Sequence, residues 1–307
     1  MKRSAIGIVP WLVALAILAA CERGSGDPSA PRVAPSSEAS PAASPSPDQT
    51  PPGGPGRDRS LRFAVIGDFG DRSLEQLTVA ARMCDWRKKH PFDLVITTGD
   101  NVYPDGSSEW FDASFFAPYK CLLDDGVRWH ASLGNHDWMT DEGRAELEEP
   151  AFGMDGENYV VREAGVRFVI ANSNDMDIEW LEQNLPARSG DRWTVAVFHH
   201  PVFSPGMHGS TESFGDLPEL FARAGVDLVL NGHDHLYSVT EPQQGIRYVV
   251  TGGGGAQLYP CLLSEESEIC RIEHHFLSVR ADEDDISVRA VPDRGRPFDR
   301  FTTRGID

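Results

Sequence analysis

The chain has 307 residues, of which 40% are apolar and 24% are charged, and its formal net charge is −19 at pH 7. This length and apolar content suffice for a full hydrophobic core, so a wholly disordered chain is excluded. The strongly negative charge and the lack of a basic cluster in the sequence argue against a polymeric nucleic acid as substrate.

The first twenty residues have the pattern of a secretory signal peptide, predicted for 1–20. A basic start precedes a nearly uncharged run from Ala5 to Ala20, which ends in small residues before Cys21. Leu-Ala-Ala-Cys resembles the lipobox of bacterial lipoproteins, which implies lipidation of Cys21 and a secreted, lipid-anchored protein of the bacterial cell envelope. An uncleaved membrane helix is the alternative, but this run contains Pro10 and is shorter than the roughly 20 residues that a span needs.

The next segment, 21–60, is dominated by Pro, Ser, Ala and Gly and contains few large apolar residues. Such a segment cannot offset the entropy lost on ordering, so we expect a disordered tether that holds the folded part away from the membrane. The remaining residues, 61–307, are predicted to form one domain.

Four cysteines follow Cys21, at positions 84, 121, 261 and 270. An even number in an oxidising compartment predicts two disulfides, for which three pairings exist. We expect Cys84 to pair with Cys121, and Cys261 with Cys270, because the short loop between the last two is typical of a stapled hairpin. A metal-thiolate site is the alternative, although the chain has no Cys-x-x-Cys motif.

Strand and helix patterns alternate through the first part of the domain. Residues 61–67 are an apolar run of strand formers that ends at Asp68, and Ser73 with Gln76 has the spacing of a capping box. Apolar residues then recur at helical spacing up to Lys89, at Leu74, Leu77, Ala81 and Cys84. Further strands are expected at 93–98, 127–133, 158–162, 166–171, 193–198 and 226–230, with helices near 177–185 and 215–224.

After His235 the pattern changes to period-two segments separated by turns, at 237–240, 246–251, 274–280 and 286–291. These segments add strands without crossover helices. We therefore expect an α/β domain of two packed mixed β-sheets flanked by helices, because polar clusters at several strand ends require a shared site at one rim.

Five short polar motifs follow predicted strands. They are Gly67-Asp68, Gly99-Asp100-Asn101-Val102-Tyr103, Gly134-Asn135-His136-Asp137, His199-His200-Pro201 and Gly232-His233-Asp234-His235. Each motif alone is typical of a turn or a cap. Together, their carboxylate, amide, phenol and imidazole groups suit iron, zinc or manganese, and a mixed set of this size suits two metal ions that share one carboxylate.

At these motifs the chain resembles the calcineurin-like metallophosphoesterases and, more narrowly, the purple or tartrate-resistant acid phosphatases, over about residues 61–240. Generic members of the superfamily place a histidine two residues after the first aspartate, where this chain has Gly70. In the purple acid phosphatases the tyrosine of a Gly-Asp-x-x-Tyr motif replaces that histidine, and Tyr103 occupies its place. The histidine is missing and the tyrosine is present in the same chain, which favours the narrower family.

The resemblance implies a centre of one ferric ion and one divalent ion, the latter Fe(II), Zn(II) or Mn(II). The expected ligands are Asp68, Tyr103 and His235 for the ferric ion, Asp100 as the bridge, and Asn135, His199 and His233 for the divalent ion. His199 is preferred to His200 because the family's motif places the ligand two residues before a proline, here Pro201. The reverse assignment of this histidine pair stays open.

Other polar residues near the motifs receive supporting roles. His136 follows Asn135, and His208 stands in a His-Gly step like one in the small acid phosphatases, so either could bind the phosphate or protonate the leaving group. A loop residue without a role is the alternative for His208. Three carboxylates, those of Asp105, Asp137 and Asp234, are expected to cap turns or support the ligands. The glycine run 252–255 is expected to form a tight loop beside the site.

The resemblance implies a metal-dependent phosphatase in which a metal-bound hydroxide attacks phosphate monoesters without a covalent enzyme intermediate. Residues 61–307 would then be the catalytic domain. The expected substrate is a small phosphate ester, with a phosphoprotein as a further option. Two alternatives stay open, a phosphodiesterase on the same scaffold and a lipoprotein that binds metal or a ligand without turnover.

Overall fold

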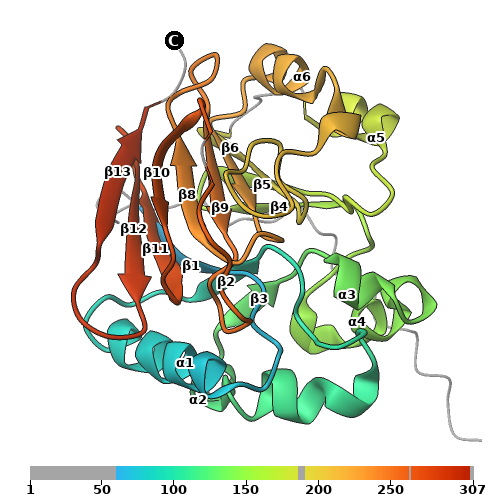
Figure 1. The fold of residues 1–307 in the computed structure, drawn as a ribbon, viewed down its shortest axis with the longest axis vertical. Coiled ribbons are helices and arrows are strands. Elements are labelled where there is room, and N and C mark those ends of the chain that lie inside the picture. The colour runs from blue at the N-terminus through green and yellow to red at the C-terminus, as the bar shows by residue number, and fades with distance from the viewer. Residues whose placement is uncertain (1–59, 186–190, 263, 305–307) are drawn as a thin grey trace, which may run out of the picture. The chain divides into compact units, whose positions relative to one another are not determined.

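The structure is a computed structural model that describes residues 60–185, 191–262 and 264–304. Two β-sheets pack face to face, and helices cover their outer faces (Figure 1). The expected α/β fold of two mixed sheets flanked by helices is therefore confirmed. The predicted signal peptide and all but the last residue of the predicted tether lie outside the described residues.

The first sheet has the strand order β13-β12-β11-β1-β2-β3. Its parallel strands are β1 (Leu61–Ile66), β2 (Leu94–Thr97) and β3 (Arg128–His130). On the other side of β1 lie the antiparallel strands β11 (His275–Ala281), β12 (Ile286–Pro292) and β13 (Asp299–Thr303). The C-terminal strands thus extend a sheet that the first strands began.

The second sheet has the order β10-β8-β9-β7-β6-β5-β4. Its parallel strands are β5 (Val166–Ile170), β6 (Trp193–Val197), β7 (Leu228–Asn231) and β9 (Arg247–Thr251). Its antiparallel strands are β4 (Tyr159–Glu163), β8 (Tyr237–Thr240) and β10 (Ser267–Arg271). The sequence did not predict β10 or β13, because both are polar, partly exposed edge strands without an apolar run.

The core consists of apolar layers on both faces of the sheets. Between the sheets, Phe63 of β1 meets Phe168 of β5 edge to face, with ring centroids 5.0 Å apart. Helix α1 (Leu74–Arg87) covers the first sheet, and α5 (Ile178–Asn184) and α6 (Leu217–Ala224) cover the second (Figure 1). Burial on both faces explains why the central strands are continuous apolar runs.

Helix α1 forms where it was expected, but it buries a different face. Leu74 and Leu77 are 77% and 46% exposed, whereas Val79, Met83 and Trp86 are buried. The predicted apolar stripe was therefore wrong. The buried stripe is hidden in the sequence because it includes the polar Gln76, whose side-chain amide donates to the carbonyl of Ser114 at 2.6 Å.

The expected capping box of α1 is only half formed. The Ser73 hydroxyl accepts from the backbone amide of Gln76 at 2.9 Å. The reciprocal bond is absent because the amide of Ser73 donates to Asp71 at 3.1 Å instead. The helix start was still predicted correctly, since one side-chain cap suffices to define it.

Short helices that the sequence did not predict fill the segments between the strands. They are 108–110, the π-helix 112–116, α2 (Lys120–Asp124), α3 (Asn135–Trp138), 141–143, α4 (Arg144–Glu148), 150–152 and 212–214. Each is too short to show a helical period in the sequence. None of the described helices is long and apolar enough to cross a membrane.

Both predicted disulfides are present. Cys84 and Cys121 link α1 to α2, with Cα atoms 6.2 Å apart. Cys261 and Cys270 tie the segment before β10 to that edge strand, with Cα atoms 6.1 Å apart. The predicted pairing is confirmed, and the metal-thiolate alternative was wrong.

Candidate metal centre

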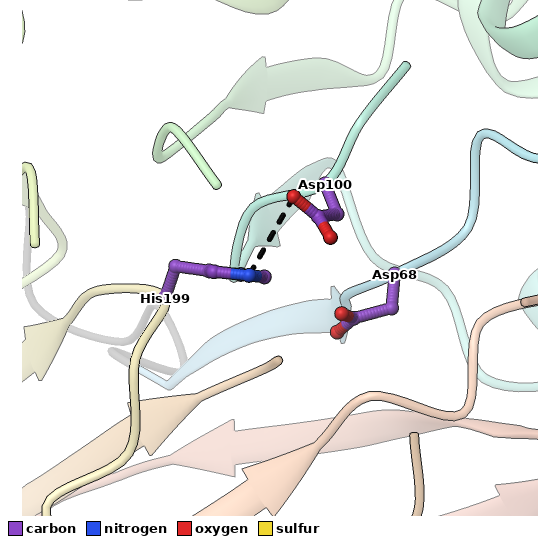
Figure 2. Close-up of side chains that lie close together, drawn as sticks. All are labelled: Asp68, Asp100 and His199. Carbon is purple, nitrogen blue, oxygen red and sulfur yellow. Dashed lines mark ion pairs between the residues drawn. The ribbon is translucent and has the colours of Figure 1, made fainter. Parts of the chain in front are cut away.

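The five polar motifs lie beyond the carboxyl ends of parallel strands. Asp68 follows β1, Asp100 follows β2, His199 follows β6, and His233 follows β7. Because the two sheets pack together, the carboxyl ends of their parallel strands share one rim. Figure 2 shows Asp68, Asp100 and His199 pointing toward a common point from three separate segments.

Glycines in the motifs allow this convergence. A Cβ atom at Gly134 would lie 2.1 Å from an oxygen of Asp100, and one at Gly232 would lie 2.6 Å from an oxygen of Asp68. Any other residue would therefore displace a carboxylate.

Three residues of the motifs have left-handed backbone conformations that non-glycine residues rarely adopt. The φ angles of Asp68, Asp100 and His233 are 56°, 51° and 69°. Each such residue costs roughly 1–3 kcal/mol, and strain of this kind clusters at functional sites. The rest of the fold therefore holds these side chains in a prescribed direction.

One group of donor atoms contains Asp68, Tyr103 and His235. The Tyr103 hydroxyl donates to Oδ2 of Asp100 at 2.9 Å and lies 3.2 Å from Nε2 of His235. That nitrogen lies 3.4 Å from Oδ1 of Asp68. The donor atoms of these three residues thus lie together beside Oδ2 of Asp100.

A second group contains Asn135, His199 and His233. Oδ1 of Asn135 lies 3.0 Å from Nε2 of His199 and 2.9 Å from Nδ1 of His233, and the two nitrogens are 3.2 Å apart. Nε2 of His199 also lies 3.5 Å from Oδ1 of Asp100. Asp100 thus stands between two groups of donors, with one carboxylate oxygen toward each.

Backbone carbonyls fix the proton positions of two of these imidazoles. Nδ1 of His199 donates to the carbonyl of Thr98 at 2.8 Å, and Nδ1 of His235 donates to that of Gln257 at 2.8 Å. A carbonyl can only accept, so the Nε2 atom of each neutral ring keeps its lone pair. Metal-binding histidines are commonly oriented in this way.

The electrostatics of the centre favour bound cations. Burial raises the pKa of Asp68 to about 7, although His235 counteracts part of the effect, and burial also raises the pKa of Asp100. Burial lowers the pKa of His199, and burial together with His199 lowers that of His233. Without a cation the two acids resist ionisation, while the imidazoles of His199 and His233 keep their lone pairs, so this donor set fits metal ions.

The histidines outside the two donor groups also lie at the centre. His136 donates from its amide to Asp100 at 2.9 Å, and its ring centroid is 4.4 Å from that of Tyr103. The ring centroids of His208 and His200 lie 4.2 and 4.5 Å from that of His233. Nδ1 of His200 is 2.9 Å from the hydroxyl of Ser173. His200 therefore borders the centre, whereas His199 points into it.

Buried carboxyl groups organise the loops behind the centre. Asp137 accepts from the amides of Asn101 and Gly134 at 2.9 and 2.8 Å, so it ties two motifs together rather than facing the donors. Glu146, which no sequence pattern indicated, is fully buried and accepts from the Asn101 side chain at 2.9 Å. Burial and the neighbouring Asp137 raise the pKa of Glu146 well above its usual range. Burial therefore favours the neutral form of Glu146.

Sequence reasoning also missed Tyr259, which no motif contains. Its ring stacks on that of His235, with centroids 4.2 Å apart and an angle of 12° between the planes. The only signal was the nearby glycine run, expected to form a tight loop beside the site. At Gly252 a Cβ atom would lie 2.8 Å from an oxygen of Asp68, so that loop does border the centre.

Comparison with known proteins gives a consistent family. Residues 61–237 match the sequence model of the calcineurin-like phosphoesterases. Purple acid phosphatase 4 of Arabidopsis thaliana is 28% identical over 81% of this chain and 85% of its own. Tartrate-resistant acid phosphatase type 5 of Homo sapiens is 24% identical over 65% of this chain and 74% of its own. Both relatives are named as acid phosphatases.

Solved structures share the fold at lower identity. A purple acid phosphatase from yellow lupin seeds has a TM-score of 0.69 and 18% identity, and the match covers 81% of this chain and 54% of that one. GAP50, described as the anchor in the inner membrane complex of Plasmodium, has a TM-score of 0.66 and 17% identity over 81% of this chain and 90% of its own. With more than half of its length matched by the family model, this chain belongs to the calcineurin-like phosphoesterase family and is a hydrolase.

Proposed function

We propose that this protein hydrolyses phosphate monoesters at a binuclear metal centre, and its similarity to acid phosphatases supports the proposal. The observation that carries the proposal is the position of Asp100, whose two oxygens each face a separate group of donors. A carboxylate in this position suits a bridge between two cations. The proposed ligands are Asp68, Asp100, Tyr103, Asn135, His199, His233 and His235.

The residues around the donors suit phosphate ester hydrolysis. Bound metal ions would activate water and neutralise charge on the phosphoryl oxygens. His136 and His208 are proposed to bind the phosphate or to protonate the leaving group, since both rings lie against proposed ligands. Nδ1 of His136 donates to the carbonyl of Pro104 at 2.6 Å, which leaves its Nε2 for the substrate.

A hollow beside the centre offers space for the organic part of the ester. It measures about 410 Å³ and borders Asn135 and His200. Its other walls include Trp138, Met139 and Asn174, and none of the described residues that line it carries a carboxylate or a guanidinium. This lining supports a small ester whose alcohol is uncharged and partly apolar.

Turnover of a paired set of esters tests the proposal. The protein, loaded with iron and with zinc or manganese, should hydrolyse p-nitrophenyl phosphate faster than bis(p-nitrophenyl) phosphate. The opposite preference would favour the phosphodiesterase. No hydrolysis of either ester by protein that carries two metals per chain would favour a binding protein without turnover.

We also propose that Cys21 carries the lipid and that the protein is held at a membrane of the cell envelope. The support is the sequence pattern of residues 1–21 alone. Cys21→Ser should release the protein from the membrane while its specific activity stays unchanged. A membrane-bound Cys21→Ser protein that carries no lipid would contradict this proposal.

A further inference from the structure

A hollow with a strongly positive lining lies on the first sheet, away from the metal centre. It measures about 470 Å³. Among the described residues, its charged walls are Arg62, Lys89, Arg280, Arg289 and Arg300, together with the acids Asp282 and Asp285. The lining thus has an excess of three positive charges, although the whole chain carries −19. We call this hollow the arginine pocket.

The arginine pocket and the metal centre lie at opposite ends of β1. Arg62 is the second residue of the strand, whereas Asp68 follows its last residue. At about 3.3 Å per residue, the six steps between them span roughly 20 Å. None of the proposed metal ligands lines the pocket. A ligand of the pocket would therefore be separate from the substrate.

Strand register places like charges directly opposite each other in this pocket. Arg62 of β1 pairs with Arg280 of β11, and Arg289 of β12 pairs with Arg300 of β13. Like charges in directly opposed positions destabilise a sheet. Arg280 has an ion pair with Asp282, which offsets part of this repulsion.

The second pair has no such compensation. Within the described ranges, the side chains of Arg289 and Arg300 make no hydrogen bond or ion pair with another residue, and both line the pocket. Two guanidinium groups with free donors on neighbouring strands form a site that an anion would stabilise. The guanidinium fork matches the oxygens of phosphate better than it matches a spherical anion such as chloride.

The residues at the end of α1 complete the pocket. Lys89 and His90 line it, and the His90 ring stacks on Trp86 with centroids 4.1 Å apart. Burial lowers the pKa of His90, and the charges of Arg289, Lys89 and Arg62 lower it further. The three cations therefore lie close enough to His90 to affect its pKa, as expected for side chains that line one pocket.

We propose that the arginine pocket binds a phosphate group, supplied either by free inorganic phosphate or by the headgroup of an anionic phospholipid. Both sources present at least two non-bridging phosphate oxygens to Arg289 and Arg300. The lipid source gains support from chain order, because the segment expected to be a membrane tether ends at Ser60, two residues before Arg62. A tethered domain would meet the membrane surface at a high effective concentration.

Titration with inorganic phosphate is the first test. In calorimetry, metal-loaded protein should show a phosphate site that Arg289→Gln/Arg300→Gln weakens roughly tenfold or more. Asp100→Asn should keep this site, because the site lies outside the metal centre. The control Arg162→Gln removes an exposed arginine elsewhere, which pairs with Asp191, and should bind phosphate as the unmodified protein does.

Vesicle binding is the second test, and it separates the two sources. Binding of the full chain is measured on vesicles of phosphatidylcholine alone and on vesicles of phosphatidylcholine and phosphatidylglycerol in equal amounts. An apolar anchor contributes equally to both, so the difference in affinity reports the anionic headgroup. Each cation near an anionic surface adds about 1 kcal/mol, so Arg289→Gln/Arg300→Gln should reduce the gain from phosphatidylglycerol roughly 30-fold.

The combined outcomes decide the proposal. A gain on vesicles that depends on the two arginines identifies the lipid headgroup as the source, and an arginine-dependent site in calorimetry alone identifies free phosphate. If neither measurement responds to Arg289→Gln/Arg300→Gln, the proposal is wrong. The test is independent of the proposed phosphatase function, because neither readout requires turnover.

Discussion

The two charged regions at the ends of β1 use burial in opposite ways. At one end, Asp68 and Asp100 are buried, and burial is the main cause that shifts their pKa values upward. At the other end, Arg62 and Arg300 are exposed to water. Water and salt screen exposed charges, whereas buried ones must be compensated by a partner. We infer that the metal centre depends on its ions, and that the arginine pocket tolerates being empty.

The largest effect should follow from Asp100→Asn, which removes the one negative charge shared by both donor groups. The substitution keeps the shape of the side chain but weakens two proposed metal sites at once. Turnover should fall by roughly 1,000-fold, comparable to the loss of a central electrostatic group. Metal content, measured by elemental analysis, should drop below two per chain. Full activity with two bound metals would remove Asp100 from the bridging position.

His275 tests whether burial controls the pKa of a group on β11, the strand that runs from the metal centre toward the arginine pocket. It is fully buried between the Thr251 hydroxyl and the carbonyl of Glu273, at 3.0 and 2.8 Å. Burial lowers its pKa to about 4 from an ordinary value of 6.5, so the unfolded chain binds the proton more readily.

The sign of the pH effect follows from this shift. The stability linked to His275 is fully present above pH 6.5 and is lost as the pH falls toward 4, by about 3 kcal/mol in total. Urea unfolding at several pH values measures the loss. In His275→Gln the acid-side slope should be shallower by about one proton, and an unchanged slope would show that another group is responsible.

The third effect concerns His208, which borders the donors without joining them. Its backbone amide donates to Asp234 at 3.0 Å, and its ring lies against His233. If His208 is a proton donor or a phosphate contact, His208→Ala should lower kcat roughly 100-fold while both metals stay bound. Loss of a metal would instead make His208 a ligand and enlarge the second donor group.

The sequence indicated the candidate metal centre but not the arginine pocket, for a physical reason. Each proposed ligand follows a strand within a short local motif, so the motifs of Asp68, Asp100 and the other ligands could be read from the sequence and interpreted together. The pocket is assembled by antiparallel register between β1, β11, β12 and β13, and β13 was not predicted. The four arginines of the pocket are scattered singly along the chain, and Lys89 ends the short basic run 87–89, so the sequence does not show them as one cluster.

The same distinction explains the errors within the fold. Helix α1 was predicted from its cap, but its buried face depends on Gln76 reaching the carbonyl of Ser114, a contact between distant residues. Glu146 likewise gains its role only through Asn101 and Asp137, on other loops. Local patterns indicate where elements begin, and tertiary contacts decide which side chains they bury.

Tyr103 should give a smaller but more specific effect, since it distinguishes a purple acid phosphatase centre from a generic one. Burial and the nearby Asp100 raise the pKa of its hydroxyl, so only a strongly bound cation such as Fe(III) would hold it as a phenolate. The iron-loaded oxidised protein should absorb visible light. Tyr103→Phe should abolish this absorption and weaken iron binding roughly tenfold. An unchanged spectrum would show that Tyr103 lies outside the coordination sphere of the iron.

The smallest effect should be found at the arginine pocket. If Arg289 and Arg300 repel each other across the strands, Arg289→Gln should stabilise the empty protein by about 0.5 kcal/mol at low ionic strength. The gain should disappear in high salt or in added phosphate, because salt screens the two charges and bound phosphate pairs with them.

As a matched control, Arg128→Gln removes an arginine that has an ion pair with Glu163, and it should give no gain in stability. Urea unfolding in low salt, high salt and phosphate measures all three values. A loss of stability in Arg289→Gln that persists in high salt would show that the arginine stem supports the sheet by packing, and it would remove the electrostatic contrast between the two ends of β1.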